Sequence, residues 1–80
     1  MMAEAYVLLK VNPGDERNIV KLLSELPEVK DVNELYGEWD ILIKVAVKNF
    51  EELDPLLSEN IRVIKGVQLT STMIVAKYRY

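Results

Sequence analysis

The chain has 80 residues, of which half are hydrophobic and 29% are charged, the composition of a folded globular domain. It contains no cysteine and no histidine, which excludes disulfides and the usual nucleophile and base of covalent catalysis. The net charge is -3 and no basic run is present, so the sequence argues against direct binding to nucleic acid.

The first half of the chain predicts a strand, a helix and a second strand. Residues Ala5 to Val11 are mostly apolar and β-favouring, and Asn12-Pro13-Gly14-Asp15 then supplies a dense turn signal. Between Glu16 and Leu26 the apolar side chains recur at helical spacing, and Pro27 ends that helix. Val29 to Tyr36 reads as a weaker, polar strand of the kind found at a sheet edge.

A second helix is expected after the third strand. Asn49 is a good residue to cap it, and Glu52 stands at the third helical position, as in a capping box. Pro55 conflicts with a regular helix, because proline removes one hydrogen bond and bends the axis. The helix is therefore expected to be kinked or to begin later, at Asp54.

The remaining strands complete a repeated pattern. Gly37 turns the chain into a strong strand from Asp40 to Val47, and Lys65-Gly66 leads into a long last strand from Val67 to Tyr80. The order strand, helix, strand, strand, helix, strand predicts two interleaved split βαβ units. We therefore expect an α+β, ferredoxin-like βαββαβ fold over residues 1–80, with a four-stranded antiparallel sheet and both helices on one face.

One face of this sheet is expected to lack cover. Alternate residues of the first and third strands are apolar and meet the helices, which leaves a second, mixed set on the other side. A bare, partly apolar face usually marks an interface, although it is also compatible with tolerated apolar surface. We predict a dimer that packs sheet against sheet through Tyr6, Leu8, Leu42, Ile74, Ala76 and Tyr78.

The stretch Tyr36-Gly37-Glu38-Trp39-Asp40 combines a glycine turn, two aromatic side chains and a carboxylate at the start of a strand. In a functional interpretation Asp40 binds the ammonium or guanidinium group of a ligand, with Tyr36 or Trp39 as walls. Gly37 would permit close approach of the backbone to that ligand. In the alternative interpretation Asp40 is a solvated hairpin residue or bonds locally to turn amides.

The last strand carries Thr70-Ser71-Thr72, three hydroxyl residues in succession. These hydroxyls are suited to a carboxylate, and with Asp40 they would complement both charges of an amino acid. They are equally well explained as ordinary strand residues, since threonine favours strands. Glu28, Asp31 and Glu34 show no convergence, and we interpret them as solvated surface.

These features resemble the carboxyl-terminal regulatory domain of the Lrp/AsnC transcriptional regulators, the RAM domain, in its stand-alone form. The resemblance covers nearly the whole chain and is carried by the Tyr36–Asp40 turn with the following apolar strand, and by Ile64 to Thr72. It implies a dimeric α/β barrel, often assembled into a ring of dimers, with amino acids or related small molecules bound between dimers. It also implies an effector site that contains Tyr36, Gly37, Glu38, Asp40, Thr70 and Thr72.

The resemblance further implies how such a domain would act. The family's DNA-binding helix-turn-helix precedes this domain, whereas four residues precede the expected first strand here, so transcriptional control would act through a partner. The leading hypothesis is a non-catalytic amino acid sensor that needs no cofactor. The alternatives are an interaction domain that forms mixed oligomers with full-length regulators, or a small dimeric α/β barrel enzyme. The short apolar runs predict a cytoplasmic protein without a membrane span.

Overall fold

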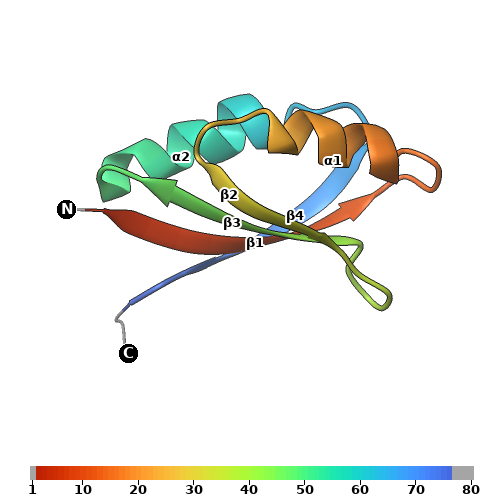
Figure 1. Cartoon of the computed structure of the whole chain (residues 1–80), viewed down its shortest axis with the longest axis horizontal. Helices are drawn as coiled ribbons and strands as arrows, with labels where there is room; N and C mark the ends of the chain where they lie inside the picture. Colours follow the sequence, from red (N-terminus) through yellow and green to blue (C-terminus); the bar gives the residue numbers. More distant parts are fainter. Residues whose placement is uncertain (1, 77–80) are drawn as a thin grey trace.

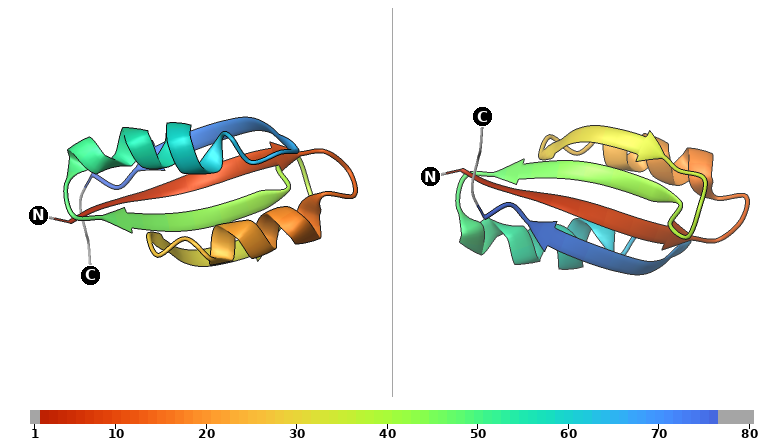
Figure 2. Two further views of the ribbon diagram at one scale, coloured as in Figure 1. Left: turned by 90° about the horizontal axis from the view of Figure 1, so that it is seen from above. Right: turned by 90° about the horizontal axis from the view of Figure 1, so that it is seen from below.

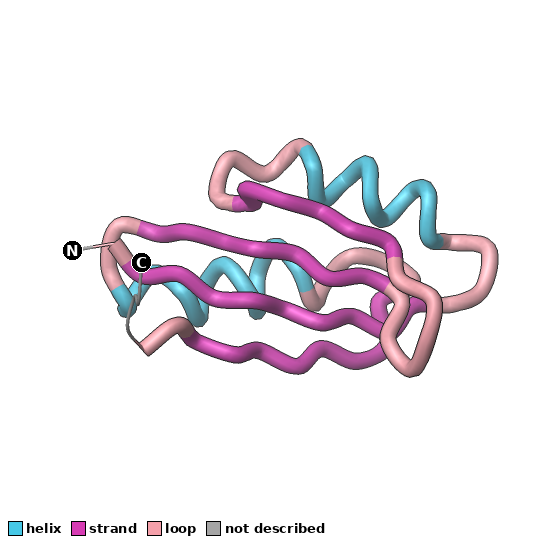
Figure 3. Tube along the Cα trace, turned by 60° about the horizontal axis from the view of Figure 1, so that its bottom comes forward, coloured by secondary structure: helices cyan, strands magenta, loops and turns pink. Residues whose placement is uncertain are grey.

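The computed structural model describes residues 2–76 and places both helices on one face of an antiparallel sheet (Figure 1). The strands are hydrogen-bonded in the order β2-β3-β1-β4 and lie side by side in Figure 3. This order is that of interleaved split βαβ units, so the predicted ferredoxin-like fold is confirmed. The strand bounds are β1 (Ala3–Val11), β2 (Val29–Glu34), β3 (Ile41–Val47) and β4 (Val67–Ile74).

The first helix, α1 (Glu16–Ser24), follows the turn at Gly14 as predicted and ends before Pro27. Its buried side chains, Ile19 and Leu23, point at the sheet, whereas Leu22 is 39% exposed. An apolar stripe of this kind stabilises a helix by packing rather than by propensity.

The second helix is irregular and begins at Phe50, not at Asp54. It runs through a 3₁₀ turn, η1 (Phe50–Glu52), an α turn, α2 (Leu53–Pro55), and a π turn, η2 (Leu56–Ile61). Pro55 cannot donate a backbone hydrogen bond, which accounts for the loss of a regular α ladder around it. The predicted capping box is wrong: Asn49 makes no side-chain cap, and its Nδ2 instead donates to Oε2 of Glu52 at 3.4 Å.

The core fills the space between the sheet and the helices. Alternate residues of β1 and β3 are buried there, as the sequence predicted, and they meet side chains from both helices. The fully buried positions with the largest side chains are Leu9, Ile19, Leu23, Ile41, Ile43 and Ile61.

The register of β4 corrects the face assigned to its side chains. Residues directly opposite one another in neighbouring strands share a face of the sheet. Thr70, Thr72 and Ile74 lie opposite Leu9, Val7 and Ala5, which are buried on the helix side. The placement of Ile74 on the uncovered face is therefore wrong.

The uncovered side of the sheet, here called the open face, is seen from below in the right panel of Figure 2. Tyr6, Leu8 and Leu42 lie on it as predicted, and Leu69 and Met73 of β4 lie there in place of Ile74. Leu69 and Met73 are 58% and 50% exposed, so the face carries more apolar surface than the sequence indicated.

A charged group lies on the same face. The Lys44 Nζ lies 3.7 Å from Oε1 of Glu4 and 5.8 Å from the centroid of the Tyr6 ring. Because both charged side chains are partly exposed, this pair contributes at most about 1 kcal/mol to stability. The open face therefore combines apolar side chains with at least one ion pair.

The end of the chain departs from the predicted long strand. The described strand stops at Ile74, and Ala76 is an exposed residue beyond it. Tyr78, the last predicted interface residue, lies outside the described residues. None of the helices within residues 2–76 is long and apolar enough to cross a membrane.

Candidate functional site

The Tyr36–Asp40 stretch forms the connection between β2 and β3, as expected. The Leu35 N–H donates to the carbonyl of Asp40 at 2.8 Å, which closes the hairpin. Gly37 has a φ of +148°, a backbone conformation that favours glycine. The Tyr36 side chain stands fully exposed at this turn, so it is available for contact with a ligand or another subunit.

The side chain of Asp40 bonds to β1 rather than to its own turn. Its Oδ2 accepts a 2.8 Å hydrogen bond from the Val11 N–H, and its own N–H donates to the carbonyl of Leu9 at 2.9 Å. The pairing of β1 with β4 changes register between Lys10 and Val11, so the Val11 N–H lies at an irregular point of the sheet. Asp40 thus has a structural role that neither interpretation of the sequence contained.

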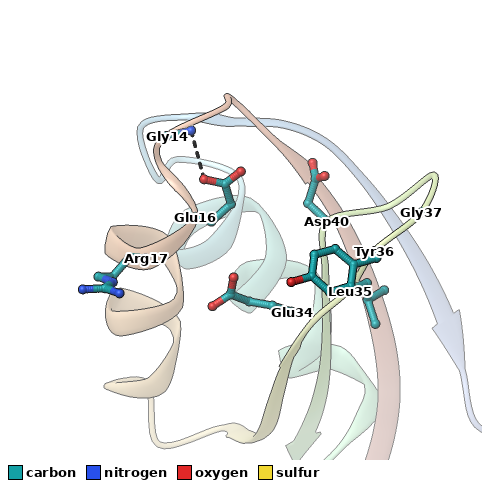
Figure 4. Close-up of a pocket in the computed structure, with 8 residues that line it drawn as sticks. All are labelled: Gly14, Glu16, Arg17, Glu34, Leu35, Tyr36, Gly37 and Asp40. Carbon is teal, nitrogen blue, oxygen red and sulfur yellow. Dashed lines mark hydrogen bonds between the residues drawn. The ribbon is translucent and has the colours of Figure 1, made fainter.

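The hairpin and the first turn of α1 together form a cavity of about 470 Å³, here called the acidic pocket. Figure 4 shows that its side chains come from three segments: the loop after β1, the start of α1 and the hairpin. The Gly14 N–H donates to Oε1 of Glu16 at 2.9 Å, which fixes one wall. The lining residues are Gly14, Glu16, Arg17, Glu34, Leu35, Tyr36, Gly37 and Asp40.

The charge of this pocket indicates what it can hold. Three carboxylates line it, and the one guanidinium in the lining, that of Arg17, points away from Glu34 and Asp40 in Figure 4. Charge-assisted hydrogen bonds to carboxylates are about twice as strong as neutral ones. The acidic pocket is therefore suited to the ammonium group of a small ligand.

Glu34 is exposed, as the sequence indicated, and it also lines the acidic pocket. It lies opposite Ile41, a core residue, so its side chain leaves the sheet on the helix side and reaches the start of α1. Strand alternation counted forward from Val32, which packs against the core, would have indicated this position. Glu38 is exposed at the hairpin and is not part of the acidic pocket's lining.

The predicted hydroxyl ligands lie elsewhere. Thr70 lines a second cavity of about 320 Å³, here called the arginine pocket, with Arg62, Val67, Gln68 and Leu69. The Nε of Arg62 donates to Oγ1 of Thr70 at 3.3 Å. Arg62 is a polar residue of this site that the sequence reasoning missed.

Thr72 lies in a third, mostly apolar cavity of about 440 Å³ between β4 and the second helix. Its Oγ1 is buried and has no hydrogen-bond partner among the described residues. Phe50 and Ile74, both about half exposed, line the same cavity. Thr72 therefore does not share a pocket with Thr70 or with Asp40.

The six predicted ligand residues thus do not converge within one chain. β1 lies between β3 and β4, and neighbouring strands are about 4.8 Å apart, so the start of β3 lies roughly 10 Å from β4. The ammonium and carboxylate groups of an amino acid are joined through one Cα and lie within about 4 Å of each other. Asp40 and Thr70 line different pockets, so a ligand in the acidic pocket does not meet the Thr70 hydroxyl of the same chain.

Comparison with known proteins identifies the relatives of this domain. The family described as "Lrp/AsnC ligand binding domain" matches residues 4–79. An uncharacterised HTH-type transcriptional regulator of Pyrococcus furiosus is 37% identical over 73 residues, which cover 88% of this chain and 49% of the regulator. The chain spans about half the length of the curated regulators it matches. A homocitrate synthase of Sulfurisphaera tokodaii is 46% identical over 59 residues, which cover 74% of this chain and 13% of that enzyme.

Solved structures share the same architecture. A hypothetical protein of Pyrococcus horikoshii is 36% identical with a TM-score of 0.89, and the match covers 95% of this chain and 92% of that one. A transcriptional regulator of Neisseria meningitidis, solved as a complex with L-Met, is 21% identical with a TM-score of 0.85. That match covers 94% of this chain and 50% of the regulator, and it shows a common fold.

Proposed function

Because the chain belongs to the Lrp/AsnC ligand-binding domain family, we propose that it is a non-catalytic domain that binds an amino acid or a related small molecule. The observation that carries this proposal is the acidic pocket beside the β2–β3 hairpin, which is suited to a ligand's ammonium group. Its lining includes Tyr36, Gly37 and Asp40, three of the positions that the resemblance to this family assigned to the effector. Relatives are transcriptional regulators, so the proposed role is regulatory and cytoplasmic.

The proposed site is completed by more than one subunit. Asp40 and Thr70 line different pockets of one chain, and we assign the second half of the site to a neighbouring subunit. A ligand bound in this way favours the assembled state, because it has a higher affinity for assembled than for separate subunits. Homodimers, and rings of dimers, are the assemblies we propose.

Calorimetric titration of the protein with each of the twenty amino acids tests this function. We expect saturable heat from at least one of them, and the complex of the Neisseria regulator with L-Met makes amino acids the first ligands to test. Light scattering in parallel records the assembly state. An oligomeric protein that binds none of the twenty would contradict the proposal and favour an interaction domain that joins full-length regulators.

The open face is the proposed dimer interface, and Leu8→Asp tests it. Leu8 lies opposite Leu42 and Ser71 at the middle of that face, so an aspartate there would be buried without a partner on association. We expect sedimentation velocity at micromolar concentration to find a dimer for the natural chain and a monomer for Leu8→Asp.

Leu22→Asp is the matched control for this experiment. Leu22 is 39% exposed on α1, on the opposite side of the molecule from the open face, and the substitution changes the charge equally. It should leave the dimer intact. Loss of the dimer in both variants, or in neither, would show that the open face is not the interface.

We propose that this domain is not itself catalytic. The match to homocitrate synthase covers 13% of that enzyme, whereas matches to regulators cover about half of each regulator. The similarity therefore concerns one small segment of the enzyme and not the whole enzyme.

A further inference from the structure

Arg62 is held beside β4 by the irregular end of the second helix. Its backbone N–H donates to the carbonyl of Leu57 at 2.8 Å, five residues earlier, which is the hydrogen bond of a π turn. π turns of this kind are frequent at functional sites. The turn brings the Arg62 side chain to Thr70, where the 3.3 Å bond from Nε to Oγ1 fixes the guanidinium.

The remaining donors of Arg62 have no acidic partner. Within residues 2–76, no aspartate or glutamate side chain forms an ion pair with Arg62. The arginine pocket also has no carboxylate in its lining, which contrasts with the acidic pocket. The polar groups it offers are the guanidinium of Arg62, the Thr70 hydroxyl and the amide of Gln68, whose Nε2 donates to Oδ1 of Asn12.

We propose that Arg62, together with the Thr70 hydroxyl, binds the carboxylate of the effector. This inference rests on the proposed function and names the group that fixes one end of the ligand. A guanidinium presents parallel N–H donors that match the two oxygens of a carboxylate. Because Thr70 accepts the bond from Nε, the terminal nitrogens of Arg62 are free to form that bidentate contact, and the Thr70 hydroxyl hydrogen remains available to donate.

Each of the two pockets then binds one charged group of the ligand. The acidic pocket of one subunit holds the ammonium group, and the arginine pocket of another holds the carboxylate. A ligand that lacks the ammonium or the carboxylate group binds with lower affinity, because the pocket meant for that group keeps an unpaired charge. The effector is thus a zwitterion or a basic amino acid, and not an amine or an amide.

A purely structural role for Arg62 makes a different prediction. A cation at the end of a helix interacts favourably with the last carbonyl groups, which would stabilise the fold without affecting ligand binding. In that case Arg62→Gln would lower stability and leave ligand affinity unchanged. Affinity and stability must therefore be measured on the same variants.

The test uses the amino acid that gives the strongest heat in the panel, and its carboxamide as a probe without the negative charge. Arg62→Gln should weaken binding of the amino acid about 10- to 150-fold, the loss expected for one charge-assisted contact. Arg62→Lys should recover part of that loss, because lysine keeps the charge without the paired donors. The carboxamide should bind the natural chain weakly and should lose nothing further in Arg62→Gln.

Lys65→Gln is the matched control, since it removes the same charge three residues away and Lys65 does not line the arginine pocket. Its affinity should stay within about twofold of the natural chain, a difference below 0.5 kcal/mol. Natural affinity in Arg62→Gln, or an equal loss in Lys65→Gln, would overturn the role of Arg62 and leave the proposed function standing.

If no amino acid binds, the proposed function fails and the arginine pocket is tested by itself. The NMR signal of the Arg62 Nε–Hε group is then followed during titration with acetate and with acetamide. A saturable shift with acetate alone supports a carboxylate pocket. No shift with acetate, or an equal shift with both, overturns it.

Discussion

Gly66→Ala is expected to lower the free energy of unfolding by about 2 to 4 kcal/mol, the sum of backbone strain and overpacking. Gly66 has a φ of +99°, and a Cβ added there would lie 2.6 Å from Oδ2 of Asp15 and 3.1 Å from Cδ1 of Ile19. Its carbonyl also accepts a 2.8 Å hydrogen bond from the Asn12 N–H. The substitution therefore disturbs the junction of the loop after β1 with the start of β4, and urea unfolding measures the loss.

Gly14→Ala separates the two contributions to this loss. Gly14 has a similar φ of +92°, but an added Cβ would have no atom within 4 Å. Its cost should be the backbone strain alone, about 1 to 2 kcal/mol. Equal losses at the two positions would show that the contact with Asp15 and Ile19 relaxes freely, and that Gly66 is required for its backbone conformation only.

The sequence predicted the fold because its strongest signals are local. In β1 and β3 every second residue is apolar and buried, so alternation alone identified the side that meets the helices. In β4 the alternation gives no such answer, because Leu69 and Met73 lie on one face and Val67 and Ile74 on the other. An edge strand with apolar side chains on both faces does not reveal its register until its neighbour is known.

The candidate site was predicted less completely, since its residues meet through tertiary structure. Asp40 was identified from its turn, but its bond to Val11 joins residues 29 positions apart. Arg62 reaches Thr70 because the second helix changes to a π turn, and no spacing rule for a regular helix predicts that contact. Glu34 was within reach of the sequence reasoning, because alternation within β2 places it on the same face as Val32, which packs against the core.

Asp40→Asn should weaken the proposed ligand binding while leaving the fold nearly intact. Asparagine keeps an oxygen that can accept the Val11 N–H, so the free energy of unfolding should change by less than about 1 kcal/mol. The variant removes the negative charge that we assign to the ligand's ammonium group. Calorimetry should therefore find affinity reduced about 10- to 150-fold, the equivalent of one charge-assisted hydrogen bond.

Asp40→Ala, by contrast, removes the acceptor as well as the charge. The Val11 N–H is then left without its partner at a partly buried position, which costs about 1 to 3 kcal/mol of stability in addition to the lost binding. Only the pair of variants separates the two roles of this carboxylate. If Asp40→Asn binds ligand as tightly as the natural chain, Asp40 serves the sheet alone, and its assignment to the ligand's ammonium group is wrong.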